Sequence, residues 1–203
     1  MTVLPKSSLL KRSILFGTIL ALSAVSNAQD YYQGIGAQLD YGSYNILYTN
    51  SLGTFTERSA TIIPGGVYKG TYSITDNDFL NVAGSIYPFL GLNVSSSTQW
   101  GSSYSIGFEI PLDFEIYLGD MEEGCFFFGA GFTFGFLSSN YFGGGPIIGP
   151  QADVGFQFPL AGRITGVRVA WTTGINSSKT DDPTITILSD KKNMLSVGGY
   201  YLF

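Results

Sequence analysis

The sequence contains no histidine and a single cysteine, Cys125, among its 203 residues. The absence of histidine excludes Ser-His-Asp and Cys-His catalytic groups and metal sites with imidazole ligands. A lone cysteine excludes an intramolecular disulfide, and Cys125 is interpreted as a small structural residue. The glycine-rich stretch 65–70 has its glycines and lysine in the wrong order for a phosphate-binding loop. The sequence therefore predicts no enzymatic activity, no metal site and no cofactor.

Charge is also scarce, because charged residues make up 12% of the chain, against about 25% in a typical soluble domain. The net charge of −5 opposes nucleic-acid binding, which needs a basic surface. Beyond the first residues, no apolar run approaches the length of about 18 residues that a spanning helix requires. The chain instead holds 27 glycines, 16 phenylalanines and 13 tyrosines. Such a composition fits a barrel with a lipid-facing outside and a tightly filled inside.

The first 28 residues have the pattern of a secretory signal peptide. Lys6, Lys11 and Arg12 form the positive region, 14–25 is mostly apolar, and Ser26-Asn27-Ala28 is a small-residue cleavage site. The predicted organisation is therefore a signal peptide at 1–28 and a single barrel domain at 29–203. Because the signal holds three basic and no acidic residues, the mature chain is more acidic than the whole sequence.

Strict alternation of side chains is clearest in residues 104–118. Every even position there is apolar, and most odd positions are small, polar or acidic. Successive strand side chains point to opposite faces, so this segment is a strand with one apolar and one polar face. Its length exceeds that of a usual soluble strand, about 5–6 residues. It suffices for a membrane-spanning strand of about 9–11 residues. We expect the apolar face to meet lipid.

Seven further segments show strand-like patterns, which predicts an all-β, eight-stranded antiparallel up-and-down transmembrane β-barrel. Pro64-Gly65-Gly66 lies within the second segment, where a bulge or a loop is the alternative to a continuous strand. The predicted strands are 33–44, 59–74, 80–93, 104–118, 125–137, 147–158, 163–173 and 193–203.

The connections alternate between short and long. Short turns are predicted at 75–78, 119–124 and 159–162, and long loops at 45–58, 94–103, 138–146 and 174–192. Outer-membrane barrels carry short periplasmic turns and longer outward loops, so both termini should lie on the periplasmic side. In the last loop, the apolar stretch 184–188 is interpreted as a hairpin extension in preference to an adhesive edge strand. Aromatic belts are then expected at the outer rim (Trp100, Tyr104, Phe136, Trp171) and at the periplasmic rim (Tyr117, Phe126, Phe158, Tyr201, Phe203).

Alternation also predicts a charge network inside the barrel. Its expected members are Asp40, Lys69, Glu109, Asp113, Glu115, Asp153 and Arg168. Because acids outnumber bases in this set, we expect Lys69 and Arg168 each to contact more than one carboxylate. Eight strands leave an interior just wide enough for side chains to fill. A filled polar core is favoured over a charged plug that gates small ions.

The last eight residues, Ser196-Val197-Gly198-Gly199-Tyr200-Tyr201-Leu202-Phe203, end the chain on an aromatic residue. Here the chain resembles the outer-membrane β-barrel families, most closely small eight-stranded members such as the OmpA transmembrane domain and OmpX, and similar porin-family barrels of Bacteroidota. The resemblance implies that Ser196, Gly198, Tyr201 and Phe203 form an assembly signal for the barrel-insertion machinery. It also implies location in the outer membrane of a Gram-negative bacterium, with outer-membrane lipid as a partner.

Four classes of function are compatible with a secreted barrel. The leading hypothesis is a non-enzymatic outer-membrane barrel with a structural or surface-interaction role. The alternative is a narrow, cation-preferring pore or small-solute channel. An enzyme embedded in the outer membrane is disfavoured, because such barrels use histidine in catalysis. A soluble, lipid-holding barrel would require the apolar faces to point inward. The loops would carry any partner, which the sequence does not name.

Overall fold

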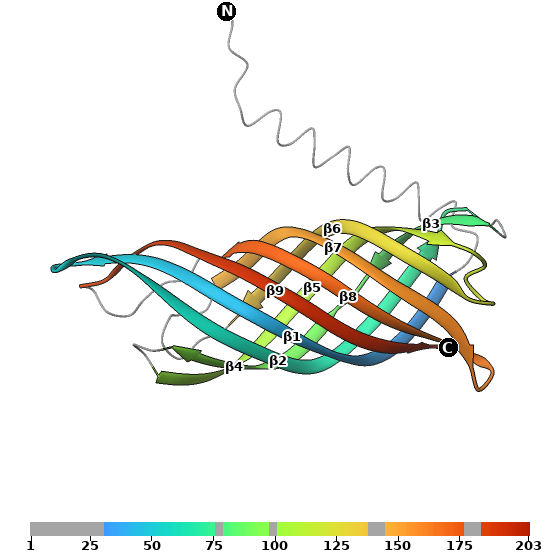
Figure 1. The fold of residues 1–203 in the computed structure, drawn as a ribbon, viewed down its shortest axis with the longest axis horizontal. Coiled ribbons are helices and arrows are strands. Elements are labelled where there is room, and N and C mark those ends of the chain that lie inside the picture. Colours follow the sequence, from blue (N-terminus) through green and yellow to red (C-terminus); the bar gives the residue numbers. More distant parts are fainter. Residues whose placement is uncertain (1–30, 76–78, 98–100, 138–144, 177–183) are drawn as a thin grey trace, which may run out of the picture.

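The computed structural model describes residues 31–75, 79–97, 101–137, 145–176 and 184–203. These residues form one antiparallel sheet that closes on itself (Figure 1). The predicted signal peptide lies outside the described residues and stays a prediction. The described part of the chain contains no helix long and apolar enough to cross a membrane. The strands are β1 (Tyr31–Asn50), β2 (Gly53–Ser73), β3 (Leu80–Ile86), β4 (Phe89–Ser97), β5 (Gly101–Leu118), β6 (Cys125–Leu137), β7 (Gly145–Leu160), β8 (Arg163–Asn176) and β9 (Thr186–Leu202).

The ring has eight positions, because β3 and β4 occupy one of them in succession. Both segments pair with β2 and with β5, and neither pairing shifts register across Tyr87 and Pro88. The Tyr68 backbone N–H donates to the Pro88 carbonyl at 2.9 Å, and the Tyr87 N–H donates to the Pro111 carbonyl at 3.0 Å. Hydrogen bonding therefore continues past the proline, and β1–β9 pairing closes the ring. The prediction of an eight-stranded up-and-down barrel is confirmed.

The chain stays in a continuous strand at two places where the sequence left a bulge or loop open or predicted a loop. β2 runs straight through Pro64-Gly65-Gly66, with Leu39↔Pro64 and Gln38↔Gly65 in unbroken register with β1. A Cβ on Gly65 would collide with the Leu90 backbone carbonyl of β4, so glycine permits close approach of these strands. The predicted long loop at 45–58 is wrong: β1 and β2 continue to Asn50 and Gly53.

The β1–β2 extension forms because its inner face is apolar. Ile46 and Tyr48 are buried, and Ile185 and Ile187 pack against them. The Tyr48 and Phe55 rings stack at a centroid distance of 5.7 Å. β9 begins at Thr186 rather than at 193, and Thr186 pairs with Thr49. Residues 186–188 thus belong to a three-stranded extension of β2, β1 and β9, which projects from the end opposite the C-terminus (Figure 1). The predicted extension of the barrel is present, and residues 177–183 of the predicted hairpin lie outside the described residues.

The short turns lie at the end that holds Tyr31 and the C-terminus. β7 and β8 join through Ala161 and Gly162 alone, which both have positive φ values of 52° and 77°. Positive φ at both central residues is the geometry of a two-residue hairpin whose twist matches the strands. This end is the periplasmic end, because outer-membrane barrels place their short turns there.

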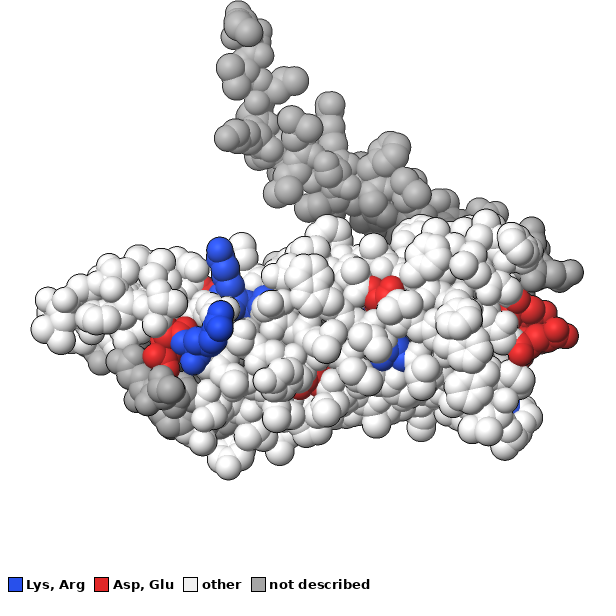
Figure 2. All heavy atoms as spheres, in the orientation of Figure 1, with Lys and Arg blue, Asp and Glu red and all other residues white. Residues whose placement is uncertain are grey.

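The outer face carries a continuous lipid-facing belt of apolar side chains. Phe132 is 57% exposed and its neighbour Thr133 is fully buried, so alternation assigns the faces as predicted. Charged atoms gather mainly at the two ends in Figure 2, and the middle is largely uncharged. One predicted rim residue, Tyr117, points inward and is buried, and Trp100 lies outside the described residues. Further members of the belt are Ile35, Leu39, Ile106, Phe108, Phe114, Phe128, Val154, Val169, Leu195 and Val197.

Replacement of Phe132 by arginine should block folding into lipid vesicles. Phe132 lies near the middle of β6, where arginine on the lipid face costs about 2–4 kcal/mol. Thr133→Ser is the control, because serine keeps the hydroxyl that donates to Gln151 Oε1 at 2.7 Å. Folded fraction is measured by heat-modifiable gel mobility; equal yields for Phe132→Arg and wild type would mean that the faces are assigned wrongly.

Candidate functional site

The interior of the barrel is the candidate site, and all seven predicted charged residues lie in it. β5 supplies Glu109, Asp113 and Glu115 at alternate positions, and each is at most 5% exposed. Asp40, Lys69, Asp153 and Arg168 are equally enclosed on β1, β2, β7 and β8. Burial of so many charges is costly unless each is paired and hydrogen-bonded, so their partners decide what the interior does.

Arg168 joins the walls of the barrel at its centre. Its Nε donates to Asp153 Oδ2 at 2.6 Å, and its Nη2 donates to Asp113 Oδ2 at 2.9 Å. The Tyr87 ring centroid lies 3.8 Å from the guanidinium carbon, which is a cation–π contact. Arg168 therefore contacts two carboxylates, from β7 and β5, and one aromatic ring from the β3–β4 junction.

Gln151 extends the Arg168 cluster along the wall. Its amide Nε2 donates to Asp113 Oδ2 at 2.6 Å, and its Oε1 accepts bonds from Thr133 at 2.7 Å and Thr172 at 3.0 Å. Small residues on the inner face of β6 make room for these groups. A Cβ on Gly129 or Gly131 would collide with Asp153 Oδ1 or Asp113 Oδ1, respectively.

Lys69 has a different environment from the one expected. Its Nζ lies 3.6 Å from Glu115 Oε2, and Glu115 is its only carboxylate partner within ion-pair distance in the described part of the chain. Nζ instead donates to the phenol oxygens of Tyr117 at 2.9 Å and Tyr200 at 3.0 Å. The centroids of the Tyr200 and Phe127 rings lie 4.4 and 4.6 Å from Nζ. Aromatic groups thus replace the second carboxylate.

Glu115 is the most heavily hydrogen-bonded carboxylate of the interior. It accepts hydrogen bonds from the hydroxyls of Ser85, Tyr87 and Tyr117, in addition to its ion pair with Lys69. Tyr87 therefore contacts Glu115 through its hydroxyl and Arg168 through its ring face. The two ionic clusters form one continuous network through this tyrosine.

A third ionic pair lies nearer the outer end and includes a residue that the sequence did not indicate. Lys192 forms an ion pair with Glu109 and is 1% exposed. The sequence placed Lys192 in a loop because strand eight was expected to begin at 193. Asp40 accepts a hydrogen bond from Gln38 Nε2 at 2.8 Å and belongs to no ion pair within the described ranges. The structure therefore brings Glu109 together with Lys192, apart from Asp113 and Arg168.

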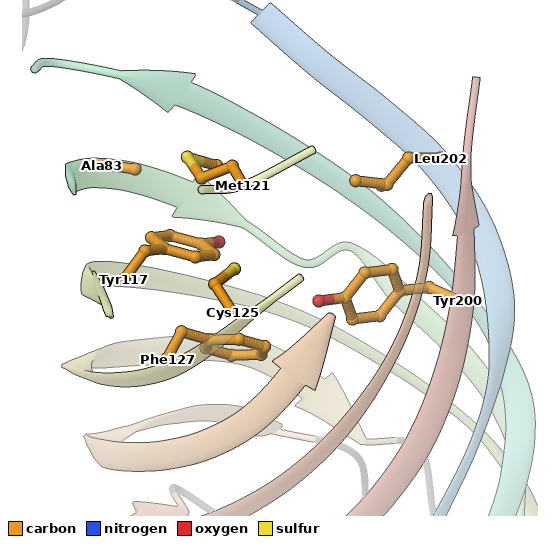
Figure 3. Packing of buried hydrophobic residues seen from close by; sticks show 7 residues of the cluster. All are labelled: Ala83, Tyr117, Met121, Cys125, Phe127, Tyr200 and Leu202. Atoms are coloured by element: carbon orange, nitrogen blue, oxygen red, sulfur yellow. The ribbon is translucent and has the colours of Figure 1, made fainter. Parts of the chain in front are cut away.

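Apolar layers separate and close these clusters. At the periplasmic end, seven buried residues from the strands and the β5–β6 turn converge across the lumen (Figure 3). A second layer lies nearer the outer end and consists of Ile63, Val67, Tyr87, Phe89 and Met194. The periplasmic layer consists of Ala83, Tyr117, Met121, Cys125, Phe127, Tyr200 and Leu202. Cys125 is an unpaired, buried member of this layer, in keeping with a packing residue.

The residues that the structure describes contain no group of three potential metal ligands from His, Cys, Asp and Glu. The interior instead pairs its three buried cations with buried carboxylates. Hydroxyl and amide groups bind further carboxylate oxygens, whereas Asp113 Oδ1 and Asp153 Oδ1 have no hydrogen-bond partner among the described residues.

The residues of the predicted assembly signal occupy both faces of β9. Ser196 is 7% exposed and points inward, while Tyr201 and Phe203 are 40% and 54% exposed at the periplasmic rim. Gly198 pairs with Gln38 on one side and with Arg168 on the other. The Phe203 N–H donates to the Gln33 carbonyl of β1 at 2.8 Å. The chain end therefore lies at the strand pair that closes the barrel.

Lys69→Met and Glu115→Gln should each lower the free energy of unfolding of the barrel when introduced alone. Removing one partner of a buried pair costs about 3–5 kcal/mol, because the other charge stays buried. The double variant removes both charges and should cost less than the sum of the single changes. Urea unfolding in lipid vesicles measures the three free energies; strict additivity would contradict a coupled pair.

Comparison with known proteins adds solved structures but no sequence relative. No protein-family model matches the sequence, and no curated protein matches it significantly. OprG of Pseudomonas aeruginosa is 14% identical and aligns over 83% of this chain and 96% of its own, with a TM-score of 0.49. Ail, the attachment invasion locus protein of Yersinia pestis, is 14% identical over 84% and 99%, with a TM-score of 0.38. Neisserial surface protein A is 17% identical over 82% and 95%, with a TM-score of 0.30.

The membrane location follows from the structure itself. A closed, even-numbered antiparallel barrel with an apolar outside and a polar inside is the architecture of outer-membrane proteins. Both properties are present here, in the closed ring of strands and the lipid-facing belt. The fold is that of a small outer-membrane β-barrel, and the expected outer-membrane location is confirmed.

Proposed function

We propose that this protein is a non-enzymatic barrel with a structural or surface-interaction role, and that its lumen does not conduct. The observation that carries the proposal is the filling of the lumen by paired charges and apolar layers. Arg168, Lys69 and Lys192 each reach from one wall to groups on another. Barrels with aqueous channels have about 16–18 strands, whereas eight strands enclose a packed interior.

The extension at the outer end supports a surface-interaction role. β2 first pairs with β4 at Ser59↔Ser97, whereas its pairing with β1 continues to Asn50↔Gly53. Among the described residues, β2 therefore has no second neighbour from Thr54 to Arg58. The Tyr68 N–H points toward β4, so alternation directs the backbone groups of Thr54, Thr56 and Arg58 to the same open side. An open strand edge accepts an added strand from a partner.

A narrow cation-preferring pore is the alternative function, and one observation favours it. Seven carboxylates but three cations are buried on the inner faces of the strands. An inward acidic excess would favour cations over anions if a path opened. The acids are Asp40, Glu57, Glu109, Asp113, Glu115, Asp153 and Asp190, and the cations are Lys69, Arg168 and Lys192.

Planar-bilayer recording separates these two functions. The wild-type barrel should be closed or show only rare, small, cation-selective openings. Arg168→Ala should raise the frequency of openings and lower thermal stability, because Asp113 and Asp153 lose their shared partner. Arg163→Ala, at the exposed start of β8 beside the β7–β8 turn, is the matched control and should leave the record unchanged. A large, steady, anion-selective conductance in the wild type would sink the proposal of a closed lumen.

We also propose that the barrel-assembly machinery recognises the last strand through Phe203. Its side chain is 54% exposed at the rim, so deletion removes little packing from the finished barrel. Deletion of Phe203 should therefore reduce surface levels in cells and leave folding into detergent largely intact. Surface labelling and in vitro gel mobility are compared; normal surface levels of the deletion variant would refute the signal.

A further inference from the structure

Two exposed cations stand together at the outer end of the barrel. Six lysines and arginines lie in the described part of the chain, of which three are buried in the lumen. Arg163 lies at the periplasmic turn. The remaining two, Arg58 on β2 and Lys191 on β9, are exposed on the outer face. Basic atoms are accordingly visible toward the end from which the β1–β2 hairpin extends (Figure 2).

The strand register places these two cations on either side of Asn45. Asn45 pairs with Arg58 across β1–β2 and with Lys191 across β1–β9. Neighbouring strands lie about 4.8 Å apart, so the two Cα atoms are about 10 Å apart. Arg58 Nε donates to Asn45 Oδ1 at 2.9 Å, and neither cation has a carboxylate within ion-pair distance among the described residues. Two positive charges therefore face outward with no acidic partner in the part of the chain that the structure describes.

The acidic neighbours of these cations lie on the other side of the wall. Glu57 precedes Arg58 and is 7% exposed, and Asp190 precedes Lys191 and is 2% exposed. Both take part in interactions of their own. On these strands both neighbouring carboxylates are therefore largely buried, and Figure 2 shows some acidic atoms beside the basic ones at this end.

A groove of about 440 Å³ lies directly on the membrane side of the pair. Its floor is small and polar, because Ser43 pairs with Ala60 on β2 and with Asn193 on β9. Trp171 Nε1 donates to Asn193 Oδ1 at 2.7 Å and holds one wall in place. The next row toward the bilayer contains Tyr41, which is 59% exposed and belongs to the lipid-facing belt. The groove is lined by Tyr41, Gly42, Ser43, Arg58, Ala60, Trp171, Asn193, Met194 and Leu195.

The order of these rows is that of a membrane interface. Aromatic residues such as Trp171 and Tyr41 mark the boundary of the hydrocarbon region, and the cation pair stands two rows farther out. Lipid headgroups lie at that depth, and basic residues there attract anionic headgroups. We propose that the groove binds the phosphorylated headgroup of an anionic outer-leaflet lipid. Arg58 and Lys191 contact its phosphate, and an acyl chain descends along Tyr41 and Leu195.

This site is separate from the proposed function of the barrel. It requires the orientation of the barrel in the membrane, and it is independent of whether the lumen conducts. The charge of the pair and the continuity of the groove with the lipid-facing belt favour a lipid over a soluble anion, because only a lipid satisfies both the cations and the apolar wall.

The test is native mass spectrometry of the full mature barrel in a non-ionic detergent, with diphosphorylated lipid A as the probe. The wild type should bind this lipid more tightly than its dephosphorylated form. Arg58→Gln combined with Lys191→Gln should weaken binding about tenfold to thirtyfold. Each basic residue near an anionic membrane surface contributes about fivefold in affinity. Arg163→Gln removes one exposed cation at the opposite end and should leave affinity unchanged.

A second pair of variants tests the groove without changing charge. Ala60→Phe fills the floor and should also weaken binding, whereas Ala152→Phe adds the same ring elsewhere on the lipid-facing side and should not. Heat-modifiable mobility verifies that every variant folds. Equal binding of the phosphorylated and dephosphorylated lipids would overturn the proposal, as would displacement of lipid by inorganic phosphate alone. A dimer that forms through this face in place of a lipid adduct would contradict it equally.

Discussion

Closure of the backbone ladder is the constraint on which the rest of this structure depends. In lipid every backbone N–H and C=O group must find a partner within the protein, and the β1–β9 register supplies the last set of partners. Once the ring is closed, strict alternation divides every strand into a lipid-facing and an enclosed side. The enclosed side of an eight-stranded ring is too narrow for bulk water, so its polar groups have to satisfy one another.

The interior meets most of this requirement by sharing partners between walls, whereas Asp113 Oδ1 and Asp153 Oδ1 have no hydrogen-bond partner among the described residues. Asp113 accepts from Arg168 and Gln151, and Glu115 accepts from three hydroxyls while it pairs with Lys69. Tyr87 belongs to both clusters. Because this tyrosine sits where Pro88 interrupts the β3–β4 strand, the irregular point of the wall coincides with the link between the two clusters. Buried polar networks of this kind favour one arrangement of the interior, since a half-satisfied network is costly.

Much of the fold could be predicted from the sequence, because the period of two in segments such as 104–118 and 125–137 depends only on strand geometry. The inward positions of Asp113 and Arg168 follow from the same parity. The hydrogen-bond and ion-pair partners of these residues could not be predicted, since they depend on the register between strands that are distant in sequence. Lys192 was missed because charged residues around Asp190 resemble a loop, although the inward parity of Met194 and Ser196 continues through it. The hairpin at 45–58 was missed because its apolar inner face is short and polar residues surround it.

The outer surface divides into the same levels as the membrane. The lipid-facing belt gives way to a polar row at Ser43 and Asn193, and then to the cations Arg58 and Lys191. Beyond them stands the extension of β1, β2 and β9, in which Thr54–Arg58 of β2 have no second neighbour among the described residues. The same three strands therefore close the barrel, meet the headgroups and reach outward, which concentrates the surface chemistry on one side of the ring.

The central claim is that Arg168 is locked between Asp113, Asp153 and Tyr87 inside a closed lumen, and NMR of its guanidinium in lipid nanodiscs tests this most directly. The account predicts an Nε–H that exchanges slowly with water and a guanidinium carbon that resonates upfield of that of an ordinary arginine, because the Tyr87 ring lies 3.8 Å from this carbon. The shift should disappear in Tyr87→Leu. A rapidly exchanging guanidinium with an ordinary chemical shift would show that water fills the lumen and would contradict the account.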